Sequence, residues 1–509
     1  MSRAVIIGGS VAGLASALTL TELGYQVEIL ERAAAAPPQT VEDAARDWSR
    51  PTVPQAVHSH AFSSLGVNLL YRRAPQIYAA LVAAGAVEID LGAAKPPMLT
   101  DRSGRPEDEE LRMLGCRRST FELVLRREVL KLAGVSVRTG ATVRGLELAP
   151  GAPPRITGVR LAGGEVVQAD IVVDCSGRRS ASGKWLAEAG VPVAADEAES
   201  CDITYYTRYY QMLTDVPPGP LNRGFGAGGL WNHYTAVLFL GDAGTFSISI
   251  GVLPEDAPMK ALRHEPAFTA ALRATPLLAG WVAPGASEPI SPVYAMGGLD
   301  NCIRGVATTR QTPVLGLFHV GDAAGTTNPS YGRGVSLALA HAYELADTLR
   351  QHPEVSLEQA TEMARRTERL LLPWYAEARQ NDNGRARLWR ATLAGIVPPQ
   401  PPDGMVTFGT AVEAAATDAF VWRRLVRVMM SLAGPATLYA DDEVRQHIAA
   451  ARASGGGFQI PGPDREELVA TVADATRGPF PVRTDGAGDA GPQIEDAADP
   501  RTVPHARAS

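Results

Sequence analysis

The sequence has few cysteines and no long apolar run. Its 509 residues include four cysteines, without a C-x-x-C pair or a spacing typical of metal ligands. This count excludes a disulfide scaffold and predicts a protein of the reducing cytoplasm. No stretch reaches the roughly 18 consecutive apolar residues that a membrane-spanning helix requires. We therefore expect no transmembrane segment.

Positive charge is also scarce. The chain carries 48 basic and 55 acidic side chains, a net charge of -7 at pH 7, and only four of the basic residues are lysines. Nucleic-acid binding needs a concentrated excess of lysine and arginine, so we expect no nucleic-acid partner. The hydrophobic content of 45% is ordinary for a globular protein, and the length suggests about three domains.

The N-terminal part alternates between strand and helix. The pattern predicts a buried strand over 4–8, a helix over 12–23 with its apolar residues on one face, and a second strand over 27–30. A strand–helix–strand order is typical of the parallel sheet of a doubly wound nucleotide-binding domain.

The turn between the first strand and the helix matches G-x-G-x-x-G with serine at the middle glycine. It consists of Gly8, Gly9, Ser10, Val11, Ala12 and Gly13. Small residues there allow a tight turn, a close approach of pyrophosphate to the backbone and close packing of helix on strand. Glu31 ends the second strand, where a carboxylate can bind ribose hydroxyls. The sequence therefore predicts a dinucleotide site.

Two other segments match the glycine pattern better but lack its context. Residues 224–229 follow a proline-rich loop and lead into a strand, and residues 486–491 lie in a C-terminal tail. The tail, 478–509, has almost no apolar residues, which predicts disorder. Since neither segment stands between a strand and a helix, we assign no phosphate site to either.

A second motif lies far along the chain. Gly321-Asp322 follows a predicted strand over 315–320 and precedes a predicted helix over 334–350. Its carboxylate can accept hydrogen bonds from a polyol chain, and Gly332 and Gly334 would let the helix N-terminus approach a flat ring. This second motif favours FAD over NAD. The similar segment 241–244 lies between two strands, 236–240 and 245–252, and predicts a hairpin turn instead.

The remaining pattern predicts strands through the middle of the chain and helices toward its end. The segment 33–54 is predicted as an irregular loop. A helix is expected over 118–132, then strands over 135–138, 142–148, 155–161 and 165–173. The C-terminal helices are expected over 356–395, 407–432, 441–453 and 464–477.

These motifs resemble those of the FAD-dependent monooxygenases of the p-hydroxybenzoate hydroxylase fold (group A type), over roughly residues 1–350. The glycine turn, Glu31-Arg32, Arg118 and Gly321-Asp322 stand in the order of that family. The segment 174–180 resembles the family's middle motif, with Ser-Gly in place of the usual Asp-Gly. Segments 53–60 and 328–334 are most similar to bacterial epoxidases of squalene-epoxidase type.

The resemblance implies an α/β fold, α+β overall, with three regions. A Rossmann-like FAD-binding domain and a β-sheet substrate domain are followed by a helical C-terminal region. The implied bounds are 1–70, 100–180 and 296–350 for the FAD-binding domain, 71–99 and 181–295 for the substrate domain, 351–477 for the helical region and 478–509 for the tail.

The resemblance also implies the cofactor-binding residues. They are Gly8, Gly9, Ser10, Val11, Ala12, Gly13, Glu31, Arg32, His60, Arg118, Val143, Gly321, Asp322, Gly332, Gly334 and Val335. By pattern alone, Arg118 could be a solvated first-turn residue and Val143 a core valine. His58 and His60 form an H-x-H pair, but no third ligand is apparent, so we expect no metal site.

The function implied is insertion of one oxygen atom from O₂, by way of a flavin C4a-hydroperoxide, into a hydrophobic small molecule of secondary metabolism. NAD(P)H is the expected electron donor, directly or through a flavin reductase, and epoxidation is slightly favoured over hydroxylation. No catalytic side chain is assigned, because the cofactor carries the chemistry. The alternatives are an oxygen-independent FAD oxidoreductase or cyclase of the same fold, and a non-catalytic flavin-binding protein.

Overall fold

In the computed structural model, β1 (Arg3–Ile7) is the central strand of a parallel sheet with the order β18-β9-β1-β2-β5. The other strands are β2 (Gln26–Glu31), β5 (Val135–Thr139), β9 (Ile171–Asp174) and β18 (Leu317–His319). Parallel pairing places the carboxyl ends of these strands at one edge, although they come from distant parts of the sequence. The predicted α/β class with a parallel sheet is confirmed.

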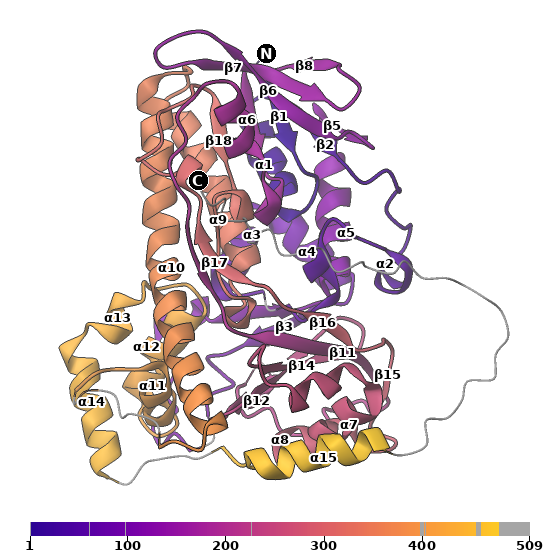
Figure 1. Ribbon diagram of the computed structural model, residues 1–509, viewed down its shortest axis with the longest axis vertical. Helices are drawn as coiled ribbons and strands as arrows, with labels where there is room; N and C mark the ends of the chain where they lie inside the picture. Colours follow the sequence, from indigo (N-terminus) through magenta and orange to yellow (C-terminus); the bar gives the residue numbers. More distant parts are fainter. Residues whose placement is uncertain are drawn as a thin grey trace, which may run out of the picture. The chain divides into compact units, whose positions relative to one another are not determined.

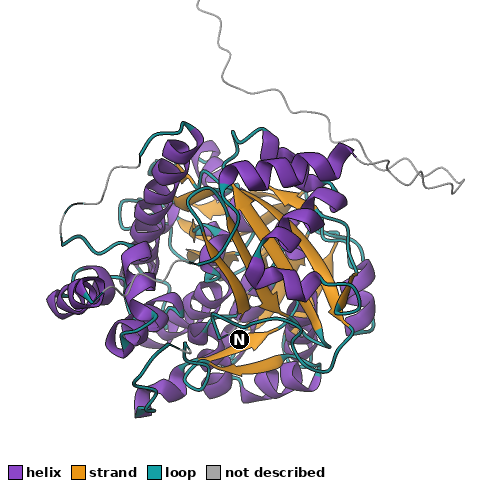
Figure 2. Cartoon of the chain, turned by 90° about the horizontal axis from the view of Figure 1, so that it is seen from below, coloured by secondary structure: helices purple, strands orange, loops and turns teal. Residues whose placement is uncertain are grey.

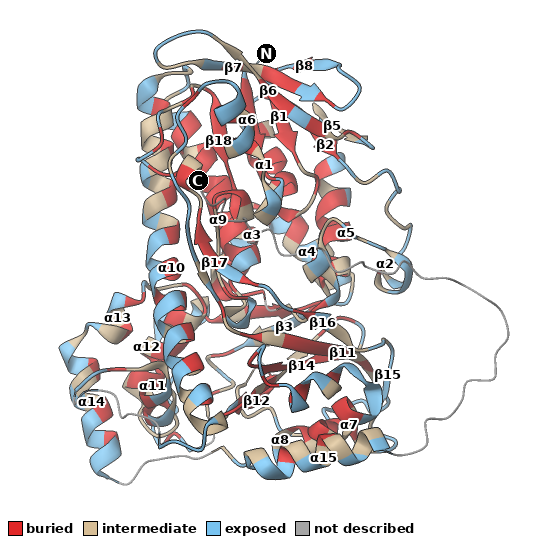
Figure 3. Ribbon diagram, viewed as in Figure 1, coloured by how far each residue is buried: buried red, intermediate tan, exposed pale blue. Residues whose placement is uncertain are grey.

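Helices cover one face of this sheet and a small antiparallel sheet covers the other. The helices are α1 (Val11–Thr21), α5 (Arg118–Leu130) and α9 (Gly334–Gln351). The small sheet consists of β6 (Val143–Ala149), β7 (Arg155–Leu161) and β8 (Val166–Gln168). Figure 3 shows β1, β2, β9 and β18 buried along most of their length, whereas the edge strand β5 is more exposed. Burial on both faces explains why the inner strands β1, β2 and β9 are rich in apolar residues.

A second, mainly antiparallel sheet has the order β12-β13-β14-β11-β15, with β16 beside β11. Its strands are β11 (Thr204–Met212), β12 (Gly226–Leu230), β13 (Thr235–Leu240), β14 (Thr245–Val252), β15 (Ser287–Pro289) and β16 (Tyr294–Met296). One face packs around Trp281 with α7 (Glu265–Ala274), α8 (Pro276–Ala279) and α15 (Arg465–Arg477). The pairing of β13 with β14 confirms the predicted hairpin at 241–244.

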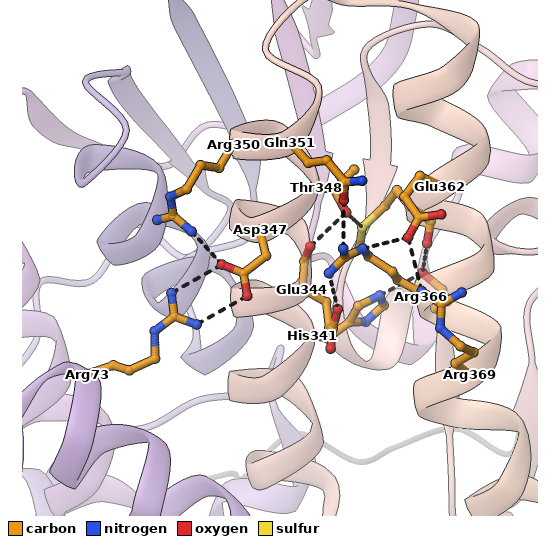
Figure 4. A network of polar contacts seen from close by, with 12 residues as sticks. Arg73, His341, Glu344, Asp347, Thr348, Arg350, Gln351, Glu362, Arg366 and Arg369 are labelled. Atoms are coloured by element: carbon orange, nitrogen blue, oxygen red, sulfur yellow. Dashed lines mark hydrogen bonds and ion pairs between the residues drawn. The ribbon is translucent and has the colours of Figure 1, made fainter.

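The long helix α10 (Leu357–Leu393) packs alongside α9 (Figure 1). Polar contacts join the two helices: the Arg366 guanidinium of α10 is 2.8 Å from the Glu344 carboxylate of α9 and 2.9 Å from Glu362 on its own helix (Figure 4). Beyond α10, the chain forms α11 (Phe408–Ala415), α12 (Ala419–Met429), α13 (Ala436–Tyr439) and α14 (Asp442–Ala453). These helices form one apolar core together with α10 and with the N-terminal end of α9.

In the view from below, helices surround the strands (Figure 2). Shorter elements connect the sheets and helices described above. They are α2 (Val41–Asp47), α3 (Ser64–Arg73), α4 (Pro75–Ala83), β3 (Val87–Asp90), β4 (Arg112–Gly115), α6 (Ser182–Glu188), β10 (Glu197–Ser200), β17 (Asp300–Ile303) and β19 (Gly325–Thr326). The structure describes residues 2–60, 62–96, 98–224, 226–397, 402, 404–454 and 460–477. The predicted tail at 478–509 and the glycine-rich segment at 486–491 lie outside the described residues. None of the described helices is long and apolar enough to cross a membrane.

Three local predictions were wrong. The single strand expected over 165–173 is two strands, because the chain passes at residues 169–170 from the small antiparallel sheet, which contains β8, to the parallel sheet, which contains β9. The helix expected over 407–432 is interrupted, because the Asp418 carboxylate accepts the N–H groups of Phe420 and Val421 and starts α12 as a new helix. The segment 33–54 is not wholly irregular: the Thr40 hydroxyl accepts the N–H of Asp43 at 3.0 Å and caps α2. Residues 1–476 pack as one unit, and the domain bounds inside it stay predictions.

Candidate functional site

The turn after β1 is packed too closely for side chains at its first and last glycines. Gly8 has a φ of +103°, and a Cβ there would lie 2.6 Å from the carbonyl oxygen of Cys175. A Cβ on Gly13 would lie 1.9 Å from the carbonyl oxygen of Gly8. Both clashes are with backbone, so a side chain at Gly13 would force α1 away from the end of β1, and one at Gly8 would force the end of β1 away from the end of β9. The turn therefore has the close packing that pyrophosphate binding requires.

The N-terminus of α1 has no side-chain cap. Ser10 holds the N-cap position, but its hydroxyl donates to the Glu122 carboxylate at 2.9 Å, and the first turn contains no acidic residue. The first N–H groups of a helix and its dipole together attract an anion. The N-terminus of α1 is thus free to bind one.

Glu31 lies beside this turn. Its carboxylate accepts the backbone N–H of Gly9 at 3.0 Å and that of Ala33 at 2.8 Å. Each carboxylate oxygen can accept a further hydrogen bond, so Glu31 remains able to bind a ribose hydroxyl.

Two other predicted cofactor-binding residues near Glu31, Val143 and Arg32, differ in burial. The backbone carbonyl of Glu31 accepts the N–H of Ala141, two residues before Val143, which brings the start of β6 to the same end of the site. Val143 is buried in the core beneath it. Arg32 is exposed.

Arg118 is buried against the turn. Its guanidinium donates to the Ser10 hydroxyl at 3.0 Å and to the Glu122 carboxylate at 3.2 Å. Arg50 also binds Glu122. Burial opposes ionisation of Glu122, but Arg118 and Arg50 outweigh it and hold the pKa of this carboxyl below its ordinary value. The structure thus excludes the solvated alternative for Arg118.

Arg50 is a site residue that the sequence analysis missed. It lies in the segment predicted as irregular, its side chain is only 8% exposed, and its guanidinium is 4.0 Å from Glu31 as well as bound to Glu122. One arginine in an arginine-rich chain gives no signal by spacing, and only the folded segment brings it to the turn.

The second motif packs directly on the first. Gly321 has a φ of +67°, and a Cβ there would lie 2.9 Å from the Cβ of Ala12. Burial raises the pKa of the neighbouring Asp322 carboxyl, and Arg118 and Arg178 oppose that shift. Within the described part of the chain, the Asp322 carboxylate forms no hydrogen bond or ion pair. It is an acceptor open to a ligand.

The middle motif closes β9 next to these residues. The buried Asp174 accepts hydrogen bonds from the hydroxyls of Ser176 at 2.6 Å and Ser180 at 2.5 Å. Ser176, which stands where the family has aspartate, is therefore turned toward Asp174. Arg178, two residues on, acts together with Arg118 against the burial that raises the pKa of Asp322.

The first turn of α9 is also open. Gly332 has a φ of +61° and ends the short turn before it, and Arg333 at the N-cap position makes no side-chain cap. A Cβ on Gly334 would meet nothing within 4 Å, whereas Val335 is buried. The helix N-terminus can therefore approach a flat group closely.

His60 and His58 stay uncharged at neutral pH. Burial, with the nearby Arg118, lowers the pKa of His60 to about 3, and burial lowers that of His58 to about 4. The ring of His60 lies stacked beside Phe62, and its Nδ1 is 2.9 Å from the His58 carbonyl oxygen, which fits a donated N–H. No group of three or more possible ligands that could hold a metal occurs among the described residues.

The segment 58–60 joins the cofactor side to the second sheet. The Nδ1 of His58 is 2.9 Å from the Thr207 hydroxyl, which is 2.6 Å from the Ser249 hydroxyl. The Ser59 hydroxyl is 2.9 Å from that of Ser249, and the Tyr209 hydroxyl donates to the His58 carbonyl. A hydroxyl-rich face of β11 and β14 thus lies against the segment that carries His60.

Comparison with known proteins gives the fold. No model of a known protein family matches the chain. Protein Rv3254 of Mycobacterium tuberculosis is 27% identical over 409 residues, which cover 74% of this chain and 79% of that protein.

Solved structures show the same architecture at low identity. PqsL of Pseudomonas aeruginosa, described as a probable FAD-dependent monooxygenase, has a TM-score of 0.54 and 14% identity, over 77% of this chain and 98% of that chain. The tetracycline destructase Tet(51) has a TM-score of 0.50 and 12% identity, over 86% and 99%. The flavin-dependent halogenase CmlS has a TM-score of 0.51 and 18% identity, over 93% and 76%. The chain shares the fold of these proteins.

Proposed function

We propose that this protein is a FAD-dependent monooxygenase that inserts one oxygen atom of O₂ into a hydrophobic small metabolite. One observation carries the proposal: the Gly8–Gly13 turn is in contact with Gly321, and Arg118 bonds Ser10 while it acts on the open carboxylate of Asp322. An anion-binding turn next to a free carboxylate suits a dinucleotide with a polyol chain. The shared fold with flavin-dependent enzymes supports FAD as that dinucleotide.

The residues divide by the part of FAD that they would hold. The turn and Arg118 would hold the pyrophosphate, and Asp322 the ribityl chain. The adenosine end would contact Glu31, Arg32 and Val143, and the flavin ring would contact His60, Gly332, Gly334 and Val335. Bound FAD would supply the activation of oxygen. The protein's part is to orient the ring, place the substrate and exclude water.

The segment 58–60 covers the hydroxyl-rich face of β11 and β14, so the substrate would lie beside this junction, on the cofactor side of the segment. The side chains named there, Thr207, Tyr209 and Ser249, are uncharged, and His58 is neutral. This favours an uncharged metabolite over an ionic one. We propose epoxidation in preference to hydroxylation, because segments 53–60 and 328–334 resemble those of the epoxidases.

NAD(P)H, directly or through a flavin reductase, is the proposed electron donor. The four cysteines are free and buried, which fits the reducing cytoplasm as the proposed location.

The first experiment identifies the cofactor and the reaction. The purified protein should release FAD, and not FMN, on denaturation. With NADPH and a panel of polyene and phenolic metabolites under labelled oxygen, mass spectrometry should find one labelled oxygen atom in the product. Release of a flavin without adenine would contradict the two-motif site. Products without label would indicate an oxygen-independent enzyme, and no turnover on any substrate would favour a flavin-binding protein.

The Gly13→Val variant tests the placement of the turn. Its side chain would enter the space held by the Gly8 carbonyl oxygen, so we expect no detectable FAD in the purified protein. A matched control is Gly163→Val, at an exposed turn where a Cβ meets nothing within 4 Å; it should keep full flavin occupancy. Normal occupancy in Gly13→Val would show that the turn is placed wrongly.

A further inference from the structure

The loop that leads into α9 is held by the C-terminal helix α10. The loop, residues 328–333, forms only a short turn over Pro329–Tyr331 and then reverses at Gly332, with a φ of +61°. Because the loop has so little regular secondary structure, it would not hold one conformation by itself. Three of its four polar side chains, Asn328, Tyr331 and Arg333, have partners on α10. The fourth, Ser330, bonds the Tyr205 hydroxyl of β11.

Asp382 is the centre of these contacts. Its carboxylate is 2% exposed and accepts hydrogen bonds from the side-chain amides of Asn328 and Asn301, both at 2.8 Å. The Tyr331 hydroxyl donates to it at 3.1 Å, and the Arg385 guanidinium lies at 3.2 Å. Four groups thus donate to this buried carboxylate, which makes the arrangement specific.

Asn328 extends the network to the second sheet. Its backbone N–H donates to the Asn301 side chain at 2.8 Å. Its side-chain oxygen accepts the Tyr205 hydroxyl of β11 at 2.6 Å and the N–H of Ser330 at 3.0 Å. The loop is therefore tied to β11, β17 and α10 through one residue.

Arg333 provides a second attachment, one residue before α9 begins. Its guanidinium donates to the Glu377 carboxylate at 2.5 Å and lies between the rings of Tyr331 and Trp374, 4.6 Å from each centroid. Glu377 in turn accepts the Tyr439 hydroxyl at 3.2 Å. The start of α9 is fixed from the α10 side at two points.

We propose that Asp382 is a positioning residue for the cofactor: by holding Asn328 and Tyr331, it sets the place of Gly332–Gly334 and of the α9 N-terminus, to which the flavin ring would bind. This rests on the proposed function. It assigns to the C-terminal helical region a role in cofactor geometry that acts through the loop. Loss of the Asp382 carboxylate leaves the amide donors of Asn328 and Asn301 without their acceptor and frees the loop.

The test uses Asp382→Asn, which keeps the shape and replaces one acceptor oxygen by a donor. Hydrogen exchange of the apoprotein should become at least about tenfold faster at residues 328–336 and stay unchanged in β1 and β2. The FAD dissociation constant should rise by roughly tenfold, and the visible spectrum of the bound flavin should shift.

Two further variants separate positioning from general destabilisation. In Asn328→Asp/Asp382→Asn the donor and the acceptor change places, so exchange and FAD affinity should return toward wild type. Glu362→Gln removes a carboxylate from the same helix, at the Arg366 and Arg369 contacts in Figure 4 and away from the loop; it should change neither quantity. If Asp382→Asn proves insoluble, Tyr331→Phe removes one donor and should give a smaller, local increase in exchange.

Each outcome decides the proposal. Local acceleration in Asp382→Asn with recovery in the double variant supports it. Unchanged exchange at 328–336, or an acceleration equal throughout the fold, overturns it. Failure of wild type to bind FAD would instead refute the proposed function, while the exchange data would still report on the loop.

Discussion

The tripeptide Gly-Asp-Ala occurs twice in the described part of the chain, and the two copies use their carboxylates in opposite ways. Asp242 is fully buried and saturated: it accepts the Arg117 backbone N–H at 2.6 Å, the Arg117 guanidinium at 2.5 Å and the Thr120 hydroxyl at 2.9 Å. Asp322 is partly buried, has no such partner and carries a raised pKa. The Asp242 carboxylate is hydrogen-bonded within the protein, whereas the Asp322 carboxylate can accept hydrogen bonds from a ligand.

The difference arises from the elements around each copy. The 241–244 segment is a hairpin turn whose carboxylate reaches the start of α5. The 321–323 segment ends a parallel strand at the edge where the glycine turn also lies. A short motif therefore predicts a site only when its flanking elements leave its polar group unpaired. Asp242 also has an indirect role that its hairpin context did not suggest, since it anchors Arg117, the neighbour of Arg118.

The largest effect is expected for Asp242→Ala. Removing one partner of a buried ion pair leaves Arg117 uncompensated, which lowers the free energy of unfolding by about 3–5 kcal/mol. The thermal melting temperature of the apoprotein should fall clearly. Glu165→Ala is the matched control. Glu165 also lies in a turn between two strands and pairs with an arginine, but this ion pair is on the surface. The melting temperature of this variant should barely change. An equally stable Asp242→Ala variant would contradict the contrast drawn above.

An intermediate effect is expected for Asp322→Ala, on cofactor affinity. A hydrogen bond to a charged partner contributes about 1.5–3 kcal/mol, so the FAD dissociation constant should rise roughly ten- to a hundredfold. The apoprotein should not be destabilised, since Asp322 has no partner to lose within the described residues. Fluorescence quenching on reconstituted apoprotein measures the constant. If Asp322→Ala binds FAD normally, the second motif is not part of the site.

The smallest effect is a pH dependence of the apoprotein. The pKa of Asp322 is raised above 3.8 by burial, so the folded state binds this proton more tightly than the unfolded state. Stability is then lost as the pH rises through the folded-state pKa. Asp322→Asn should raise the melting temperature at pH 7 by a few degrees, with a difference that disappears toward pH 4. Melting curves from pH 4 to pH 8 measure it, and a difference independent of pH would exclude the carboxyl group as its cause.

Much of the fold was predictable from local pattern. The strand–turn–helix at 3–21, the hairpin at 235–252 and the long helices α9 and α10 follow from apolar periodicity and glycine positions. The break between α11 and α12 had a signal in Asp418, a good N-cap residue, which periodicity alone overlooked.

The chemistry of the candidate site was only partly predictable. Glycines at 8 and 13 are required by backbone contacts that the motif already implies, and the glycine at 321 by its positive φ and its contact with the Cβ of Ala12. Arg50 and Asp382 were not predictable, because each is one charged residue without a distinctive spacing, and its role depends on partners distant in the sequence: 72 residues separate Arg50 from Glu122, and 54 separate Asp382 from Asn328.

The sequence by itself determined the elements and the residues with special backbone needs, since helix and strand periodicity and glycine geometry depend on near neighbours. Only the tertiary structure decided which carboxylates are paired with protein groups and which remain able to bind a ligand. Asp242 and Asp322 stand in the same tripeptide, and their partners differ because the placement of Arg117 and Thr120 beside the first carboxylate comes from packing across distant segments.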